Sequence, residues 1–227
     1  MLEGLTVGGY LPSSFLDWDG HVCAVIFTAG CNFRCPWCHN RELALSSSEP
    51  LSASAVVADI ARRAKFLDGV VVSGGEPTIW SGLFPLLREL KALGISVKLD
   101  TNGSCPEVLS EVLSEGLAAH VAMDVKARFD AEVLMRCTGA AVNPEVLRRS
   151  VALIREKAPS YEFRTTYVPN LVSKADMLAL RRELSDDEHW IVQCFKPVNC
   201  IDPSYMDFPA VSADEVRAFL PSVRVRG

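Results

Sequence analysis

Short apolar stretches rich in β-branched residues alternate along this chain with segments of helical periodicity, and this alternation constrains the fold more than any other feature. Strands joined by crossover helices form a parallel sheet, and near-continuous hydrophobicity is typical of strands covered on both faces. Six strands are predicted, as VCAVIFT from Val22, GVVVS from Gly69, ISVKLDT from Ile95, HVAMDV from His120, YEFRTTYV from Tyr161 and HWIVQCF from His189. Helices are predicted over about 52–67, 83–93, 107–115, 144–157, 174–184 and 212–220.

Six strand–helix units are fewer than a closed eight-unit barrel requires, so we predict an α/β fold with a partial (β/α)6 barrel that is open on one side. With 227 residues, of which 49% are hydrophobic, the chain is long enough for one sizeable core. We expect a single domain over residues 1–227, with its core at about 20–200 and a short extension at each end. Ser52 and Ser212 are expected to cap helices, and Gly94 to end one.

The polar motifs fall where the predicted strands end. CNFRCPWCHN follows the first strand, SGGEPT the second, DTNG the third and DVKA the fourth, while RTTYVP and QCFKP lie at the ends of the last two. The carboxyl ends of parallel strands meet at one edge, where the connecting loops carry the chemistry of such folds. We therefore predict one site at that edge.

Three cysteines, Cys31, Cys35 and Cys38, lie within eight positions and have no fourth cysteine close by. An iron–sulfur cluster of four irons ordinarily takes four thiolates, and an open coordination position marks a site that binds an exchangeable ligand. The missing ligand is thus predicted to be a small molecule. The alternative is a zinc site completed by Cys23 or His39.

The remaining features exclude other classes of function. The formal charge is −5, with 23 Lys and Arg against 28 Asp and Glu, and no basic run indicates a nucleic-acid partner. The sequence shows neither a signal peptide nor a membrane-spanning stretch, so we expect a cytoplasmic protein without a membrane partner. Cys194 and Cys200 are two cysteines without partners, and we interpret them as buried thiols rather than ligands of a second cluster.

The spacing CxxxCxxC, with Trp37 before the last cysteine, resembles the signature of the radical S-adenosylmethionine (SAM) superfamily. From about Ser14 to Pro203 the chain resembles the anaerobic ribonucleoside-triphosphate reductase activating proteins, which activate glycyl-radical enzymes. The resemblance implies one 4Fe-4S cluster held by Cys31, Cys35 and Cys38, with the methionyl group of SAM on the fourth iron.

The resemblance also implies a set of residues that bind SAM. Glu76 of the GGEP motif would receive the ammonium group, and Lys126 would meet the carboxylate. Asp100 and Asp124 would lie beside the methionyl group and help to hold a monovalent cation. The full set of expected cofactor-binding residues is Trp37, His39, Gly74, Gly75, Glu76, Pro77, Asp100, Thr101, Asp124, Lys126 and Gln193. Arg164 and Thr166 are further candidates for contacts with the ribose or adenine, whereas Tyr167 and Phe195 are expected in the core.

The implied activity is reductive cleavage of SAM to a 5'-deoxyadenosyl radical, which takes a hydrogen atom from a glycine of a partner enzyme. The partner would be a glycyl-radical enzyme, here anaerobic ribonucleotide reductase, and the electron donor would resemble flavodoxin or ferredoxin. No acid–base catalytic residue is required, because cluster and SAM carry the chemistry. Two alternatives stay open: a radical SAM enzyme that acts on a small molecule, as 7-carboxy-7-deazaguanine synthases do, and a non-catalytic electron-transfer module.

Overall fold

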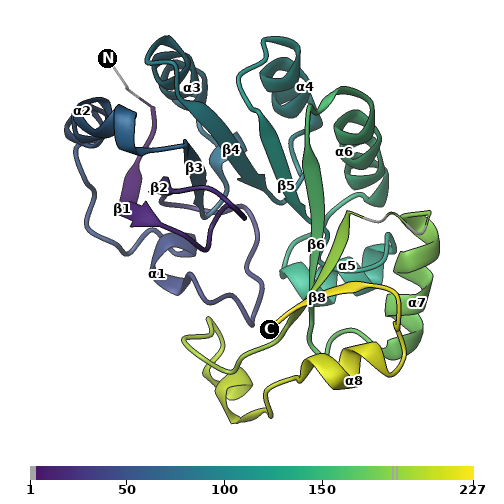
Figure 1. The fold of residues 1–227 in the computed structure, drawn as a ribbon. Coiled ribbons are helices and arrows are strands. Elements are labelled where there is room, and N and C mark those ends of the chain that lie inside the picture. The colour runs from purple at the N-terminus through teal and green to yellow at the C-terminus, as the bar shows by residue number, and fades with distance from the viewer. Residues whose placement is uncertain (1–3, 186, 188) are drawn as a thin grey trace.

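The described part of the chain forms one curved sheet in which eight strands follow their order in the sequence (Figure 1). The computed structural model describes residues 4–185, 187 and 189–227. β1 is antiparallel to β2, and every later neighbouring pair is parallel. The strands are β1 Val7–Ser14, β2 Cys23–Thr28, β3 Gly69–Gly74, β4 Ser96–Thr101, β5 His120–Asp124, β6 Tyr161–Tyr167, β7 Trp190–Cys194 and β8 Arg224–Arg226.

Helices cover the outer side of this curved sheet (Figure 1). Those in the described part of the chain are α1 Arg41–Ala44, α2 Ala53–Arg63, α3 Leu83–Ala92, α4 Pro106–Ser114, α5 Ala131–Thr138, α6 Pro144–Lys157, α7 Lys174–Glu183 and α8 Ala213–Arg217. Three 3-10 turns are η1 Ala64–Phe66, η2 Pro77–Ile79 and η3 Pro203–Asp207. Within the described residues, the structure contains no helix with both the length and the apolar character needed to cross a membrane.

The predicted α/β class with an open parallel sheet is confirmed, and all six predicted strands form. The sequence reading missed β1 and β8, the two edge strands. β1 contains two glycines and a proline, which are rare inside strands, and β8 has only three residues. The sheet therefore extends beyond the expected core of about 20–200 at both ends.

The helix predictions are close to the observed elements, and the expected caps form. The side chains of Ser52 and Ser212 accept hydrogen bonds from the backbone N–H groups of Ala55 and Glu215. Gly94 has a φ of +73°, which glycine adopts without steric cost. The short helices α1 and α5 were missed, since four and eight residues carry too little periodicity to stand out.

The two faces of the sheet differ in chemistry because successive side chains of a strand point to opposite sides. One face packs on the helices and forms the main core, which contains Val70, Val72 and Leu99. On the other face, Trp18 packs with Cys23, Val25 and Val71 beneath the amino ends of the strands. Charged side chains also lie on that inner face and contact one another, namely Lys98, Asp100, Asp124, Glu162 and Arg164.

Candidate active site

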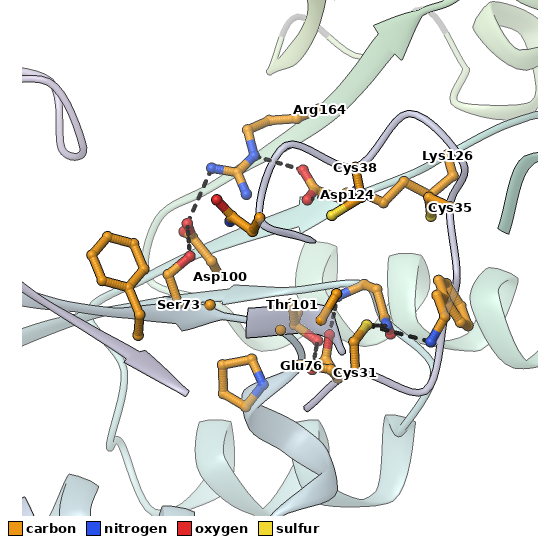
Figure 2. A pocket seen from close by; sticks show the side chains of 18 of the residues that line it. Cys31, Cys35, Cys38, Ser73, Glu76, Asp100, Thr101, Asp124, Lys126 and Arg164 are labelled. Atoms are coloured by element: carbon orange, nitrogen blue, oxygen red, sulfur yellow. Dashed lines mark hydrogen bonds and ion pairs between the residues drawn. The ribbon is translucent and has the colours of Figure 1, made fainter. Parts of the chain in front are cut away.

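The loop after β2 brings the three cysteines to a cavity of about 420 Å³ at the carboxyl ends of the strands. Cys31, Cys35 and Cys38 all line this cavity, whose volume lies within the range typical of small-molecule sites, about 300–1,000 Å³. Burial raises the pKa of Cys35 to about 12, although nearby Lys126 opposes the shift. Burial also raises the pKa of Cys31. In Figure 2, Cys35 and Cys38 lie beside Lys126, while Cys31 lies on the side of Glu76.

The GGEP motif packs directly against the start of the cysteine loop. The N–H of Gly75 donates to Thr28 O at 2.9 Å, and the N–H of Glu76 donates to Gly30 O at 2.9 Å. A Cβ on Gly75 would lie 2.0 Å from Gly30 O, and Gly74 has a φ of +117°. Only glycines allow the two loops to approach this closely, so the motif fixes the position from which Cys31 starts.

Glu76 is fully buried and accepts four hydrogen bonds. Its Oε1 accepts from Thr78 N at 3.1 Å, Thr78 Oγ1 at 2.5 Å and Thr101 Oγ1 at 2.8 Å, and its Oε2 accepts from Asn102 N at 2.6 Å. Burial raises the pKa of Glu76, against the opposing effect of these donors. Glu76 thus joins the GGEP and DTNG loops. Oε1 accepts three of the four hydrogen bonds and Oε2 accepts one, so Oε2 is better placed to accept a hydrogen bond from a ligand.

Arg164 on β6 lies between the two predicted aspartates (Figure 2). Its Nε donates to Asp124 Oδ1 at 2.8 Å and its Nη1 to Asp100 Oδ2 at 3.3 Å, while Ser73 Oγ donates to Asp100 Oδ2 at 2.9 Å. Burial disfavours ionised Asp124, but Arg164 and Lys126 outweigh burial and hold its pKa far below the ordinary value. Both aspartates line the cavity, and Arg164 supplies the positive charge between them.

Lys126 connects the carboxylate cluster to the cysteine loop. Its Nζ donates to Asp124 Oδ2 at 3.0 Å and lies 5.1 Å from the centre of the Trp37 ring, within cation–π range. Burial opposes its charge, but Asp124 and the cysteine thiols outweigh burial and raise the pKa of Lys126. A cation held beside the thiols favours binding of anionic groups here.

The structure brings most predicted site residues to the 420 Å³ cavity, including Gly74, Pro77, Thr101 and Gln193. Trp37 and His39 instead line an adjoining cavity of about 360 Å³, which shares Cys35, Cys38, Asp124, Lys126 and Gln193 with the first. Thr166 lines this second cavity and donates to Gln193 Oε1 at 3.4 Å. Tyr167 and Phe195 are buried in the core, as expected.

Several residues at the site were not among the candidates predicted from the sequence. Ser73 orients Asp100, and Asn102 joins Glu76 to the cysteine loop through its side-chain bond to Asn32 at 2.9 Å. Lys98 and Glu162 lie deeper in the interior, 3.4 Å apart, and extend the charged cluster. The alternation of side chains along a strand could have revealed these two. Lys98 lies two residues before Asp100 and Glu162 two residues before Arg164, so each shares a face of the sheet with a predicted site residue.

The two residues proposed to complete a zinc site have other partners. Cys23 lies at the floor of the sheet, where its thiol donates to Ser14 O at 3.6 Å. His39 Nε2 donates to Lys196 O at 2.7 Å. Among the described residues, no three His, Cys, Asp or Glu side chains converge on one point as ligands of a single ion would. Cys194 and Cys200 are both buried.

Comparison with known proteins decides the family, because residues 25–179 match the radical SAM superfamily. The chain belongs to the radical SAM superfamily. A protein of Methanocaldococcus jannaschii named as a glycyl-radical enzyme activating enzyme is 32% identical over 93% of this chain and 88% of its own length. The 7-carboxy-7-deazaguanine synthase of Hyperthermus butylicus is 42% identical, but over only 39% of this chain and 38% of its own.

The radical SAM fold is also evident from solved structures. Streptococcus suis SuiB, bound to the precursor peptide SuiA, superposes with a TM-score of 0.66 at 18% identity, over 89% of this chain and 48% of SuiB. At that identity the likeness shows the fold alone, and the chain spans about half of the SuiB length. These comparisons confirm the prediction of a radical SAM enzyme in its family and its fold.

The residues present fit the two cofactors that the radical SAM family uses, a 4Fe-4S cluster and SAM. Three thiols line one cavity, which leaves one iron for an outside ligand. Asp100 Oδ1 is buried without a hydrogen-bond partner, and Lys98 Nζ lies 3.8 Å away. Together with Lys126, this oxygen gives the cavity groups of both signs for a ligand that carries an ammonium and a carboxylate.

Proposed function

We propose that this chain is the activating enzyme of a glycyl-radical enzyme and that its partner is anaerobic ribonucleoside-triphosphate reductase. The observation that carries the proposal is the convergence of the cysteine loop, GGEP, DTNG and DVKA on one cavity, where Asp124 accepts hydrogen bonds from both Lys126 and Arg164. The relative named as a glycyl-radical enzyme activating enzyme, which covers 93% of the chain, supports the same assignment.

In this proposal, Cys31, Cys35 and Cys38 hold the cluster, and Trp37 and His39 flank the last ligand. The cluster and SAM, when bound, supply the one-electron chemistry that produces a 5'-deoxyadenosyl radical. The protein binds, orients and shields them. Glycines 74 and 75 let the backbone approach closely, and Pro77 starts the turn that presents Glu76.

The charged residues would orient SAM by its amino-acid end. Lys126 is the cation available to the carboxylate, while Glu76 and Asp100 offer oxygens to the ammonium group. Thr101 holds Glu76, and Gln193 lies where the two cavities meet. The monovalent cation near Asp100 and Asp124 stays a prediction, as do the cytoplasmic location and the flavodoxin- or ferredoxin-like donor. The single domain over residues 1–227 is also proposed.

The test begins with anaerobic reconstitution of the cluster in the wild type and in Cys35→Ala. Electron paramagnetic resonance spectra of the reduced protein, with and without SAM, are recorded while 5'-deoxyadenosine is assayed. We expect a SAM-dependent spectral shift and nucleoside production, both lost in Cys35→Ala. Addition of anaerobic ribonucleotide reductase should then yield a glycyl radical on the reductase. SAM cleavage without that radical would retain the radical enzyme and refute the partner.

A second candidate function is a small-molecule reaction of the 7-carboxy-7-deazaguanine synthase type. The local similarity to the Hyperthermus butylicus enzyme favours it, although this similarity covers 39% of the chain. Product formation from that enzyme's substrate, with no radical on any glycyl-radical enzyme, would support it. A full cluster whose spectrum ignores SAM would instead indicate an electron-transfer module.

A further inference from the structure

The segment Lys196–Asp202, which we name the strap, follows β7 and lies across the second half of the cysteine loop. Four hydrogen bonds join the two segments. His39 Nε2 donates to Lys196 O at 2.7 Å, and Asp202 N donates to Pro36 O at 2.9 Å. The Asn199 side-chain Nδ2 donates to His39 O at 2.9 Å and to Glu42 Oε2 at 3.3 Å.

The two halves of the cysteine loop are held by different parts of the fold. The first half does not depend on the strap: Phe33 N donates to Cys31 Sγ at 3.3 Å, and Arg34 N donates to Thr138 O, at the end of α5, at 2.6 Å. The second half, from Cys35 to Glu42, makes the contacts with the strap. Two of the three thiols, those of Cys35 and Cys38, therefore lie on the half of the loop that the strap contacts.

The backbone of Asn199 adopts an uncommon conformation in which its side chain reaches the cysteine loop. Its φ is +51°, a left-handed conformation that most non-glycine residues avoid but that asparagine tolerates. The side chain is exposed, so apolar burial does not account for its position. In this conformation its amide reaches the carbonyl of the residue next to Cys38.

We propose that Asn199 is a positioning residue, which holds the Cys35–Cys38 half of the loop in ligand geometry through the His39 carbonyl and Glu42. A fixed His39 carbonyl sets the orientation of the His39–Asn40 peptide, one residue beyond Cys38, and so limits the backbone conformations and the directions that the Cys38 thiol can take. This role concerns retention of the cluster. It is independent of the partner enzyme and of the substrate.

The test uses Asn199→Gly, because glycine keeps the left-handed backbone without strain and removes both amide hydrogen bonds. Under anaerobic conditions the reconstituted protein is exposed to bathophenanthroline disulfonate, and iron release is followed by absorbance. We expect release roughly tenfold faster than in the wild type, as the loss of two modest hydrogen bonds implies. Asn199→Asp, which lacks the N–H donors and places a carboxylate beside Glu42, should release iron at least as fast.

Hydrogen exchange of the cluster-free protein gives a second readout that does not depend on activity. The amides of Cys38, Ala44 and Leu45 donate to carbonyls of the strapped half, those of Cys35, Asn40 and Arg41, so faster opening should raise their exchange about tenfold. The amide of Arg34, in the first half, should exchange at the wild-type rate.

Ser185→Gly is the matched control, since Ser185 has a φ of +54° and follows α7, which lies apart from the cysteine loop. If Asn199→Gly releases iron and exchanges amides no faster than Ser185→Gly, the proposal is wrong. A uniform rise in exchange with an equal loss in the free energy of unfolding would also overturn it, because Asn199 would then stabilise the whole fold rather than position the loop.

Discussion

Replacement of Arg164 by glutamine tests whether the charged cluster is the electrostatic centre of the site. Arg164 has a side chain that is only 12% exposed, and it contacts Asp124 at 2.8 Å, Asp100 at 3.3 Å and Glu162 at 3.8 Å. Arg164→Gln removes the positive charge that offsets the negative charges of these three buried or half-buried carboxylates. Removing one partner of a buried ion pair typically costs about 3–5 kcal/mol, so we expect a loss of that size, or roughly 10 °C in Tm.

The pH dependence of this loss has a defined sign. In the folded wild type, Arg164 and Lys126 outweigh burial and depress the pKa of Asp124, so their contribution is present above the ordinary aspartate pKa, about 3.9, and is lost as the pH falls through the folded value. In the variant, the unpaired carboxylates take up protons more readily. The difference between wild type and variant should therefore be largest near pH 7 and should narrow below about pH 5.

The measurement is urea unfolding of cluster-free protein, followed by tryptophan fluorescence at several pH values under reducing conditions. Arg88→Gln provides the control. Like Arg164, Arg88 uses two of its nitrogens in carboxylate contacts, here both with Glu115, but its side chain is 52% exposed. It should cost less than about 1 kcal/mol. The reasoning fails if Arg164→Gln costs no more than Arg88→Gln, or if its cost is the same at pH 7 and pH 4.

Three further predictions concern the cysteine loop, the cofactor cavity and the interior. Gly75→Ala places a Cβ 2.0 Å from Gly30 O and should prevent cluster assembly, seen as lost iron content, whereas Gly20→Ala, with open space around it, should cost only about 1–2 kcal/mol of left-handed strain and keep the iron. Lys126→Met should retain the cluster but weaken SAM binding about tenfold or more, measured by titration of the spectral shift; unchanged affinity would remove Lys126 from the SAM site. Burial, and to a smaller extent the charge of Lys98, lowers the pKa of His120 to about 4. The imidazole therefore binds a proton more tightly in the unfolded chain, and the free energy of unfolding should fall as the pH drops from about 6.5 to 4. After allowance for partial exposure this loss should be about 1–2 kcal/mol, and His120→Asn should abolish it in urea unfolding.

The motifs lie at the carboxyl edge of the sheet, where they were predicted, because that prediction depends on local sequence alone. Each motif begins at or just after the end of its strand, so the cysteine loop, GGEP, DTNG and DVKA had to meet at one edge once the sheet was parallel. The sequence reading assigned Glu76 to the SAM ammonium group. In the structure, its four hydrogen bonds also make it the junction between two loops.

The contacts that the sequence did not reveal join strands far apart in the chain. Arg164 lies 64 positions from Asp100, and Arg226 meets Glu162 across the same interval of 64. A single charged residue on a strand gives no sign of its partner until the order of strands and their register are fixed. Asn199 illustrates the same limit, because its contact with His39 spans 160 positions.

The sequence by itself determined the alternation of strands and helices, the three thiols and the edge at which they gather, because hydrophobic periodicity and motif spacing are local properties. The tertiary structure alone decided how the inner face is charged, that Arg164 lies between two aspartates, and that the strap holds half of the cysteine loop. Buried charges must find partners within a few ångströms, and only strand order, register and packing bring such partners together.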